Sequence, residues 1–227
     1  MSKGLLIFGT GKIAEVIYYY ATEECGYKVA AFTIDEQYRT GNTFLGLPVI
    51  PFHEIEKLYP PVEYDMFVAL GYHDINALRE NKCKEAIARG YHLASIVSPN
   101  THVPKNVTIG HNVFIMPPSI IHPCVKIGNN VFVWSGSVVG HHSHIKDNCW
   151  LTSGCNVSGN VVMGENTFVA INATIGHSVI MGRDCFVGAN ALIIKNAQDG
   201  QVFIAESTKP LKVNSKQFLK FSNFSSL

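Results

Sequence analysis

Three histidines fall within the segment Gly140-His141-His142-Ser143-His144, and His177 follows further along the chain. Imidazole exchanges protons near neutral pH, so one of them could act as a general base toward an amine or hydroxyl that attacks an acyl group. Histidines from two copies of the chain could instead hold Zn²⁺ with an open position for water. A third interpretation is structural, with these side chains lying at a contact between subunits.

A second segment with chemical potential is Gly9-Thr10-Gly11-Lys12, which follows the apolar run 4–8 and precedes a helical stretch at about 13–21. A strand, a Gly-rich turn and a helix are typical of the phosphate-binding start of a doubly wound unit. Gly9 and Gly11 would let backbone N–H groups approach a diphosphate, and the helix N-terminus favours the anion.

Two acids, Asp35 and Glu36, come directly after a second predicted strand at 28–33. An acid at this place typically meets a ribose hydroxyl or a base edge. A solvated turn is the other interpretation, and spacing alone does not separate the two.

The histidine segment belongs to a stretch with a strict six-residue period. From Val97 to Ile193 every sixth residue is Ile, Val, Leu or Met, and Gly often follows. Six residues fit neither a helix nor an alternating strand, but they fit a coil that turns a corner every six residues, three times per turn. The period therefore predicts a parallel β-helix, in which each Gly relieves a tight turn with left-handed backbone.

In this register His141, His142 and His144 point outward from the predicted prism. His177 is two full coils beyond His141 on the same face, roughly 10 Å along the stack at strand spacing. A flat prism face has no pocket of its own. A pocket would form where two prisms pack side by side, which predicts a symmetric homotrimer.

Composition narrows the function classes. Of 227 residues, 47% are hydrophobic and 15% charged, with a net charge of +1, so we expect a globular protein that binds neither nucleic acid nor a membrane surface. None of the six cysteines forms a CxxC pair, and Cys149, Cys155 and Cys185 fall on small inward positions of the coil. We expect a reduced, cytoplasmic enzyme or binding protein.

The chain divides into three parts by these patterns. Residues 1–96 are expected to form a small Rossmann-like α/β domain with room for one mononucleotide-sized ligand. Residues 97–197 form the β-helix, and residues 198–227 are a basic C-terminal tail that leaves the six-residue phase.

This arrangement resembles a known family. A short nucleotide-binding α/β domain followed by a left-handed hexapeptide β-helix is similar to sugar acyltransferases of the sialic acid O-acetyltransferase and the bacillosamine and perosamine N-acetyltransferase type. The resemblance covers almost the whole chain, from Gly4 to about Lys209. It implies acetyl-CoA as co-substrate, a nucleotide-linked amino sugar as acceptor, and no metal.

The resemblance also implies roles for single residues. The family's catalytic His lies in a stretch similar to 140–143, which places the general base on His141. The bacillosamine branch has Glu at the next position, where this chain has His142. Either His142 takes a substrate-binding part or another acid, such as Asp147, serves.

For acetyl-CoA, the family's contacts correspond to Gly159, Ile171 and Ala189, with backbone N–H groups near Gly159 stabilising the oxyanion. The loop after the prism corresponds to 205–209, of which only Lys209 matches.

On the nucleotide side, the resemblance places Gly9, Gly11 and Lys12 near the phosphates and Asp35 and Glu36 near the base or ribose. A second loop corresponds to a segment that contains Gly71, Asn76 and Arg79, and Arg79 could pair with a phosphate. A helix-surface charge is the alternative for Arg79.

The leading hypothesis is acetyl transfer from acetyl-CoA to the amino group of a nucleotide-linked deoxyamino sugar. The closest alternative transfers to a hydroxyl, as in sialic acid O-acetylation. Two further alternatives are a trimeric zinc hydratase resembling γ-carbonic anhydrase, whose histidine spacing does not match 141, 142 and 144, and a trimer that binds a nucleotide sugar without catalysis.

Overall fold

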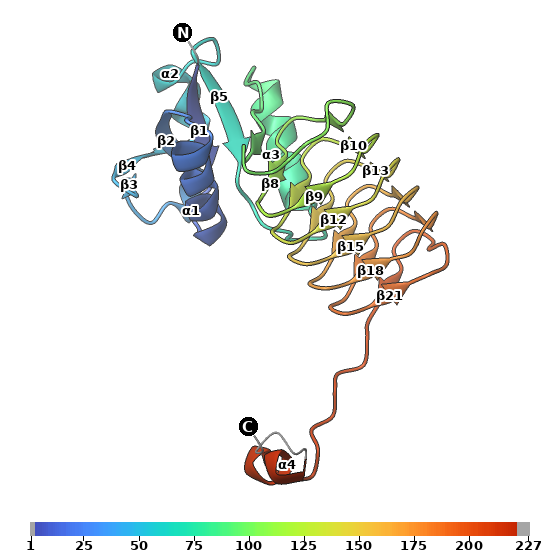
Figure 1. Cartoon of the computed structure of the whole chain (residues 1–227). Helices are drawn as coiled ribbons and strands as arrows, with labels where there is room; N and C mark the ends of the chain where they lie inside the picture. Colours follow the sequence, from blue (N-terminus) through green and yellow to red (C-terminus); the bar gives the residue numbers. More distant parts are fainter. Residues whose placement is uncertain (1–2, 222–227) are drawn as a thin grey trace.

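In the computed structural model, which describes residues 3–221, a small α/β domain lies beside the first coils of a long stack (Figure 1). The outermost residues of the expected first and last parts, 1–2 and 222–227, lie outside the described residues. Between residues 3 and 221, no helix has the length and apolarity that crossing a membrane requires.

The α/β domain is built on a sheet with strand order β3-β4-β2-β1-β5, parallel except for the β3–β4 pair. Its first strand is central because four consecutive apolar residues of Gly4–Phe8 are buried between the layers. Its elements are β1 (Gly4–Phe8), α1 (Lys12–Tyr19), η1 (Tyr20–Glu24), β2 (Val29–Ile34), η2 (Glu36–Tyr38), β3 (Thr43–Phe44), β4 (Leu47–Pro51), η3 (Phe52–Glu54), α2 (Ile55–Leu58), β5 (Tyr64–Val68) and α3 (Ala77–Ala88).

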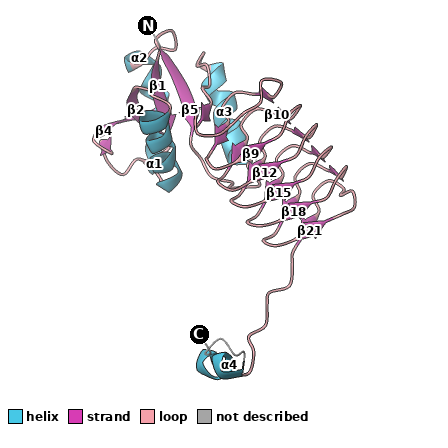
Figure 2. Ribbon diagram, in the orientation of Figure 1, coloured by secondary structure: helices cyan, strands magenta, loops and turns pink. Residues whose placement is uncertain are grey.

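The prism consists of two-residue strands that stack in parallel into three sheets, one sheet per face (Figure 2). Strands of one face are 18 residues apart, as a period of six with three faces requires. The strands are β6 (Ile96–Val97), β7 (Thr108–Ile109), β8 (Phe114–Ile115), β9 (Ile120–Ile121), β10 (Lys126–Ile127), β11 (Phe132–Val133), β12 (Val138–Val139), β13 (His144–Ile145), β14 (Trp150–Leu151), β15 (Asn156–Val157), β16 (Val162–Met163), β17 (Phe168–Val169), β18 (Thr174–Ile175), β19 (Ile180–Met181), β20 (Phe186–Val187), β21 (Leu192–Ile193) and β22 (Val202–Phe203).

The interior of the prism is apolar and dry. The aliphatic residue of each strand points inward and packs with the small residue two positions before it, as Val113 and Ile115 do. Cys149, Cys155 and Cys185 are fully buried in this core as free thiols, and burial raises the pKa of Cys149 to about 12. The expectation of small buried hydrophobes at these positions is confirmed.

The glycines of the repeat act differently from the expectation. Gly110 and Gly140 are not left-handed; a Cβ on Gly140 would lie 2.5 Å from the Gly159 nitrogen of the next coil, so the side chain is excluded by stacking. The left-handed backbone falls two residues later, at a position that tolerates Asn, Asp or Gly. It is occupied by Asn112, Cys124, Asn130, Gly136, His142, Asn148, Gly154, Asn160, Asn166, Asn172, Ser178, Asp184 and Asn190.

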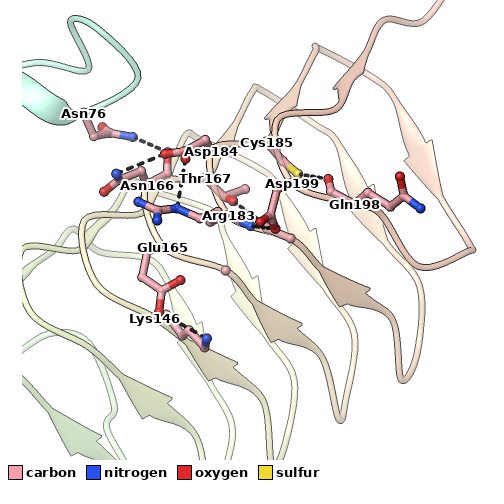
Figure 3. Close-up of polar contacts among 12 residues, drawn as sticks. Asn76, Lys146, Glu165, Asn166, Thr167, Arg183, Asp184, Cys185, Gln198 and Asp199 are labelled. Atoms are coloured by element: carbon pink, nitrogen blue, oxygen red, sulfur yellow. Dashed lines mark hydrogen bonds and ion pairs between the residues drawn. The ribbon is translucent and has the colours of Figure 1, made fainter.

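One corner of the prism carries a polar ladder that reaches the α/β domain. Asn112 exchanges hydrogen bonds with the backbone of Val68 in β5, and Asn130 donates to Asn148 on the next coil at 2.9 Å. Further along, the Asn76 amide donates to the Asn166 carbonyl, and the Asn166 amide donates to Asp184 (Figure 3). Amide side chains at the left-handed position thus tie successive coils to each other and to the segment before α3.

Arg79, on α3, lies at the centre of this junction and is fully buried. The structure contradicts its expected pairing with a phosphate. All five N–H groups are used: Nε donates to Asn130 Oδ1, Nη1 to Asn76 Oδ1 and the Gly71 carbonyl, and Nη2 to the Asn130 and Asn148 carbonyls. The guanidinium also packs on aromatic rings, those of Phe132 at 4.7 Å and Trp150 at 5.0 Å.

After β22 the chain leaves the stack in an extended path and ends in the short helix α4 (Ser215–Phe221), which lies apart from the prism (Figure 1). This segment is exposed, including Lys209.

We expect Arg79→Lys to lower the free energy of unfolding by about 3 kcal/mol, because one ammonium cannot serve acceptors arranged around a planar fork. Denaturant unfolding of the purified protein measures this. Arg89→Lys is the control: Arg89 forms a partly exposed pair with Glu56, and its change should stay within about 0.5 kcal/mol. Equal effects for the two variants would contradict the role assigned to Arg79.

Candidate active site

His141 lies at the prism corner between β12 and β13, with its imidazole exposed. The six-residue period sets this position, because the corner residue after Gly140 must point away from the filled interior. The ring leans along the corner toward the next coil and lies over Gly159. His141 thus presents a ring nitrogen to solvent on a rigid element, as a general base requires.

His142 occupies the left-handed corner position, with φ of 58°. Its Nδ1 lies 3.2 Å from His141 Nδ1, and the two rings are nearly perpendicular. A hydrogen bond between two imidazole nitrogens holds one proton, so one ring donates and the other accepts. When His141 donates from Nδ1, its Nε2 keeps a lone pair and can accept a proton.

Gly159 stands one coil beyond His141 at the same corner. A Cβ here would lie 2.7 Å from both Cε1 and Nε2 of the His141 ring, so only Gly permits this ring position. Among residues 3–221 no acceptor takes the Gly159 backbone N–H. An unpaired amide donor therefore lies directly beside the Nε2 of His141.

His177 stands one further coil along the same corner. Its ring centroid is 6.1 Å from that of His141, closer than the roughly 10 Å expected from coil spacing. The missing side chain of Gly159 explains the difference, because the His141 ring leans into the space it leaves. The corner thus carries two imidazoles on either side of one glycine.

The α/β domain holds the second candidate region, a cavity of about 410 Å³ at the carboxyl ends of its parallel strands. Gly9, Gly11, Lys12 and Gly71, all selected from the sequence, line it together. Gly11 is the N-cap of α1 and leaves the first helical N–H groups pointing outward. Strand ends and a helix N-terminus make this a site suited to an anionic ligand.

Ile34, Tyr72 and His73 also line this cavity and were missed by sequence reasoning. Position could have revealed them: Tyr72 and His73 follow Gly71 shortly after β5, and the carboxyl ends of parallel strands meet at one edge.

Asp35 and Glu36 line a separate cavity of about 340 Å³ with Lys82 and Arg89. Asp35 forms an ion pair with Lys82 at 2.9 Å, and Glu36 pairs with Arg39 at 2.8 Å. The Arg39 hydrogen bond holds the pKa of Glu36 below its usual range. Both carboxylates already have cationic partners, so their expected contact with a base or ribose stays a prediction.

Ile171 and Ala189 are exposed on consecutive coils of one corner, but that corner differs from the one that carries His141 and Gly159. Lys209 lies on the tail beyond the stack. Within one chain the expected acetyl-CoA residues therefore do not form a single surface.

The cavity and the histidine corner lie on opposite sides of the prism. The α/β domain packs on the face made by β8, β11 and β14, where Phe67 contacts Phe132. His141 lies at the corner between the other two faces. A ligand held in the cavity cannot meet the His141 of the same chain.

Across residues 3–221, no three His, Cys, Asp or Glu side chains are grouped so that they could hold a metal ion. The exposed ring nitrogens of His141, His142 and His177 therefore lack the set of neighbours that a zinc centre requires.

Comparison with known proteins assigns the prism. The family model described as bacterial transferase hexapeptide (six repeats) matches residues 106–141 and 160–195. The prism is built of hexapeptide transferase repeats. No curated protein matches the chain at a significant level.

Solved structures extend the likeness to the whole chain. A histidine-to-asparagine mutant of perosamine N-acetyltransferase from Caulobacter crescentus, in complex with CoA and GDP-perosamine, is 27% identical, with a TM-score of 0.80 over 89% of this chain and 93% of that one. WeeI from Acinetobacter baumannii AYE is 20% identical, with a TM-score of 0.76 over 88% and 96%.

The acetyltransferase domain of PglB from Neisseria gonorrhoeae FA1090, in complex with acetyl coenzyme A, is 22% identical, with a TM-score of 0.66 over 93% and 100%. The resemblance inferred from the residues is confirmed, as is the fold, a Rossmann-like α/β domain followed by a left-handed parallel β-helix. Hexapeptide transferases of this architecture include the sugar N-acetyltransferase named above.

We expect Gly159→Ala to displace the His141 ring, because the added Cβ would lie 2.7 Å from Nε2. Acetyl-transfer activity should fall by about 100-fold or more, as the loss of a positioned catalytic group does. Steady-state kinetics measure this, and a circular-dichroism melt checks the fold. Gly41→Ala is the control, since its Cβ would meet no atom closer than 3.9 Å. Full activity in Gly159→Ala would contradict the close packing of ring and glycine.

Proposed function

We propose that this chain transfers an acetyl group from acetyl-CoA to the amino group of a nucleotide-linked deoxyamino sugar, with His141 as general base. The observation that carries the proposal is the exposed His141 ring beside the unpaired Gly159 amide, on hexapeptide repeats. Similarity to a perosamine N-acetyltransferase structure that contains CoA and GDP-perosamine supports the substrate class.

In this reaction the amine attacks the thioester carbonyl carbon and gives its proton to His141 Nε2. Negative charge develops on the carbonyl oxygen, and the Gly159 N–H stabilises it as a preorganised donor. The C–S bond then breaks and CoA leaves as the thiolate. Base and amide donor are adjacent, so both can act on one tetrahedral intermediate.

His142 has a positioning part in this scheme. By accepting the Nδ1 proton of His141 it selects the tautomer whose Nε2 is free. It also receives part of the positive charge when His141 becomes an imidazolium. A neutral imidazole can take this part where the similar bacillosamine enzymes use a carboxylate.

The sugar nucleotide is bound in the cavity of the α/β domain. Backbone amides near Gly9 and Gly11, together with Lys12, would hold the diphosphate at the N-terminus of α1. Gly71 forms the opposite wall, held in place by Arg79. Asp35 would reach the ribose only after exchanging its contact with Lys82.

The active site is completed by a second copy of the chain in a homotrimer. Because the cavity and His141 lie on opposite sides of one prism, the sugar in the cavity of one copy must meet the His141 of its neighbour. The same packing brings the exposed corner of Ile171 and Ala189 toward the neighbour's Gly159, which forms a groove for acetyl-CoA. Lys209, on the exposed tail, can approach the CoA from outside the groove.

The reaction takes place in the cytoplasm, in this proposal. All six cysteines are free thiols, which agrees with a reducing compartment. Acetyl-CoA is the co-substrate, and no metal takes part.

We expect His141→Asn to lower kcat by at least about 1,000-fold, because the general base is lost and no carboxylate replaces it. Release of CoA thiol with nucleotide-linked amino sugars measures the rate. Sedimentation velocity checks that the trimer persists. His144→Asn, at an exposed histidine on β13 of the same segment, is the matched control. Undiminished activity in His141→Asn would overturn the assignment, and activity only toward hydroxyl acceptors would assign O-acetylation instead.

We expect His142→Asn to lower kcat by roughly 10- to 100-fold with KM nearly unchanged, since the tautomer of His141 is no longer fixed. Asn suits this test because it occupies the same left-handed position in seven other coils, Asn130 among them. A changed KM with an unchanged kcat would indicate substrate binding rather than positioning.

A further inference from the structure

His177 has no part in the reaction as described so far, and the fold does not need it. Its side chain is exposed at the corner, and among residues 3–221 its ring contacts only that of His141. Corner positions of this kind accept many residues, such as Ile171 and Ala189 on another corner. A second imidazole at the one corner that carries the base is therefore informative.

The three successive coils place three different donors or acceptors in one line. His141 lies on one side of the Gly159 amide and His177 on the other, with ring centroids 6.1 Å apart. A thioester whose oxygen accepts from the Gly159 N–H would contact both rings. The attacking amine must lie on the side of His141, which leaves the opposite side of the reacting carbon, toward His177, for the sulfur.

We propose that His177 donates a hydrogen bond to the sulfur of acetyl-CoA and stabilises the thiolate that leaves, an inference that rests on the proposed function. The C–N bond forms and the C–S bond breaks, with the electron pair of the broken bond remaining on sulfur. The amine proton goes to His141. The thiolate, held by the His177 N–H, takes a proton from solvent as CoA departs, and His141 returns its proton to solvent.

The charges around this position favour an anionic sulfur. Lys195 follows His177 by 18 residues and is exposed on the next coil, so the corner continues with a cation. The other titratable group facing His177 is His141 itself. No carboxylate of the described residues forms an ion pair at this corner.

The test measures the state of the thiol directly. CoA is bound to the full-length protein, and the ultraviolet absorbance of its thiolate is followed across a pH series, with calorimetry to establish CoA binding. In the wild type we expect the bound thiol to ionise about one pH unit below free CoA. His177→Ala should abolish this difference and lower kcat by about tenfold or more. His177→Gln, which keeps an N–H donor, should retain part of both.

His144→Asn is the matched control and should keep the wild-type thiol ionisation and rate. If His177→Ala binds CoA, ionises the thiol as the wild type does and keeps its kcat, the role of His177 is overturned while the acetyltransferase proposal stands. If the wild type ionises bound CoA as expected but acetylates no sugar, the role of His177 stands and the acceptor assignment fails. If CoA does not bind, both are overturned.

Discussion

The arrangement of the whole molecule depends on one buried cation. Arg79 is removed from water with no carboxylate to neutralise it, and its charge is balanced by five oxygen acceptors and two aromatic faces. Burial lowers its pKa to about 10, so the guanidinium stays protonated at neutral pH. Its acceptors come from α3, from the loop after β5 and from two coils of the prism, and a rigid planar fork satisfies them in one geometry only. The nucleotide-sized cavity is thereby fixed to the prism, because Gly71 is both a cavity wall and an Arg79 acceptor.

Close stacking is the second constraint, and it links the fold to the chemistry. Coils approach each other so tightly at the corners that residues such as Gly140 have no space for a side chain. The same absence at Gly159 lets the His141 ring lean along the corner and reach toward His177. A feature that serves packing along most of the stack therefore shapes the active site at one corner. The left-handed position next to it gives His142 its direction, so that its Nδ1 faces that of His141.

The chemistry is divided between parts of the chain that cannot meet within one copy. The cavity faces one side of the prism, and the base lies at the opposite corner. Such a division makes assembly a condition of activity and gives a reason for a rigid prism, since the distance between two sites in neighbouring copies is set by its faces. It also explains why the expected acetyl-CoA residues fall on two corners, which only packing of neighbouring prisms can bring together.

The sequence by itself determined the fold of residues 97–197, because a six-residue period admits one kind of coil, and it placed His141 outward and Gly9, Gly11 and Lys12 together at a helix start. These features depend on local spacing alone. Only the tertiary structure decided the fate of Arg79, which a helical pattern places on a surface but which the prism covers. It also decided the partners of Asp35, the unused donor of Gly159, and the distance between His141 and His177. Each of these depends on which distant segments pack together and which space they leave, and no local pattern of residues encodes that.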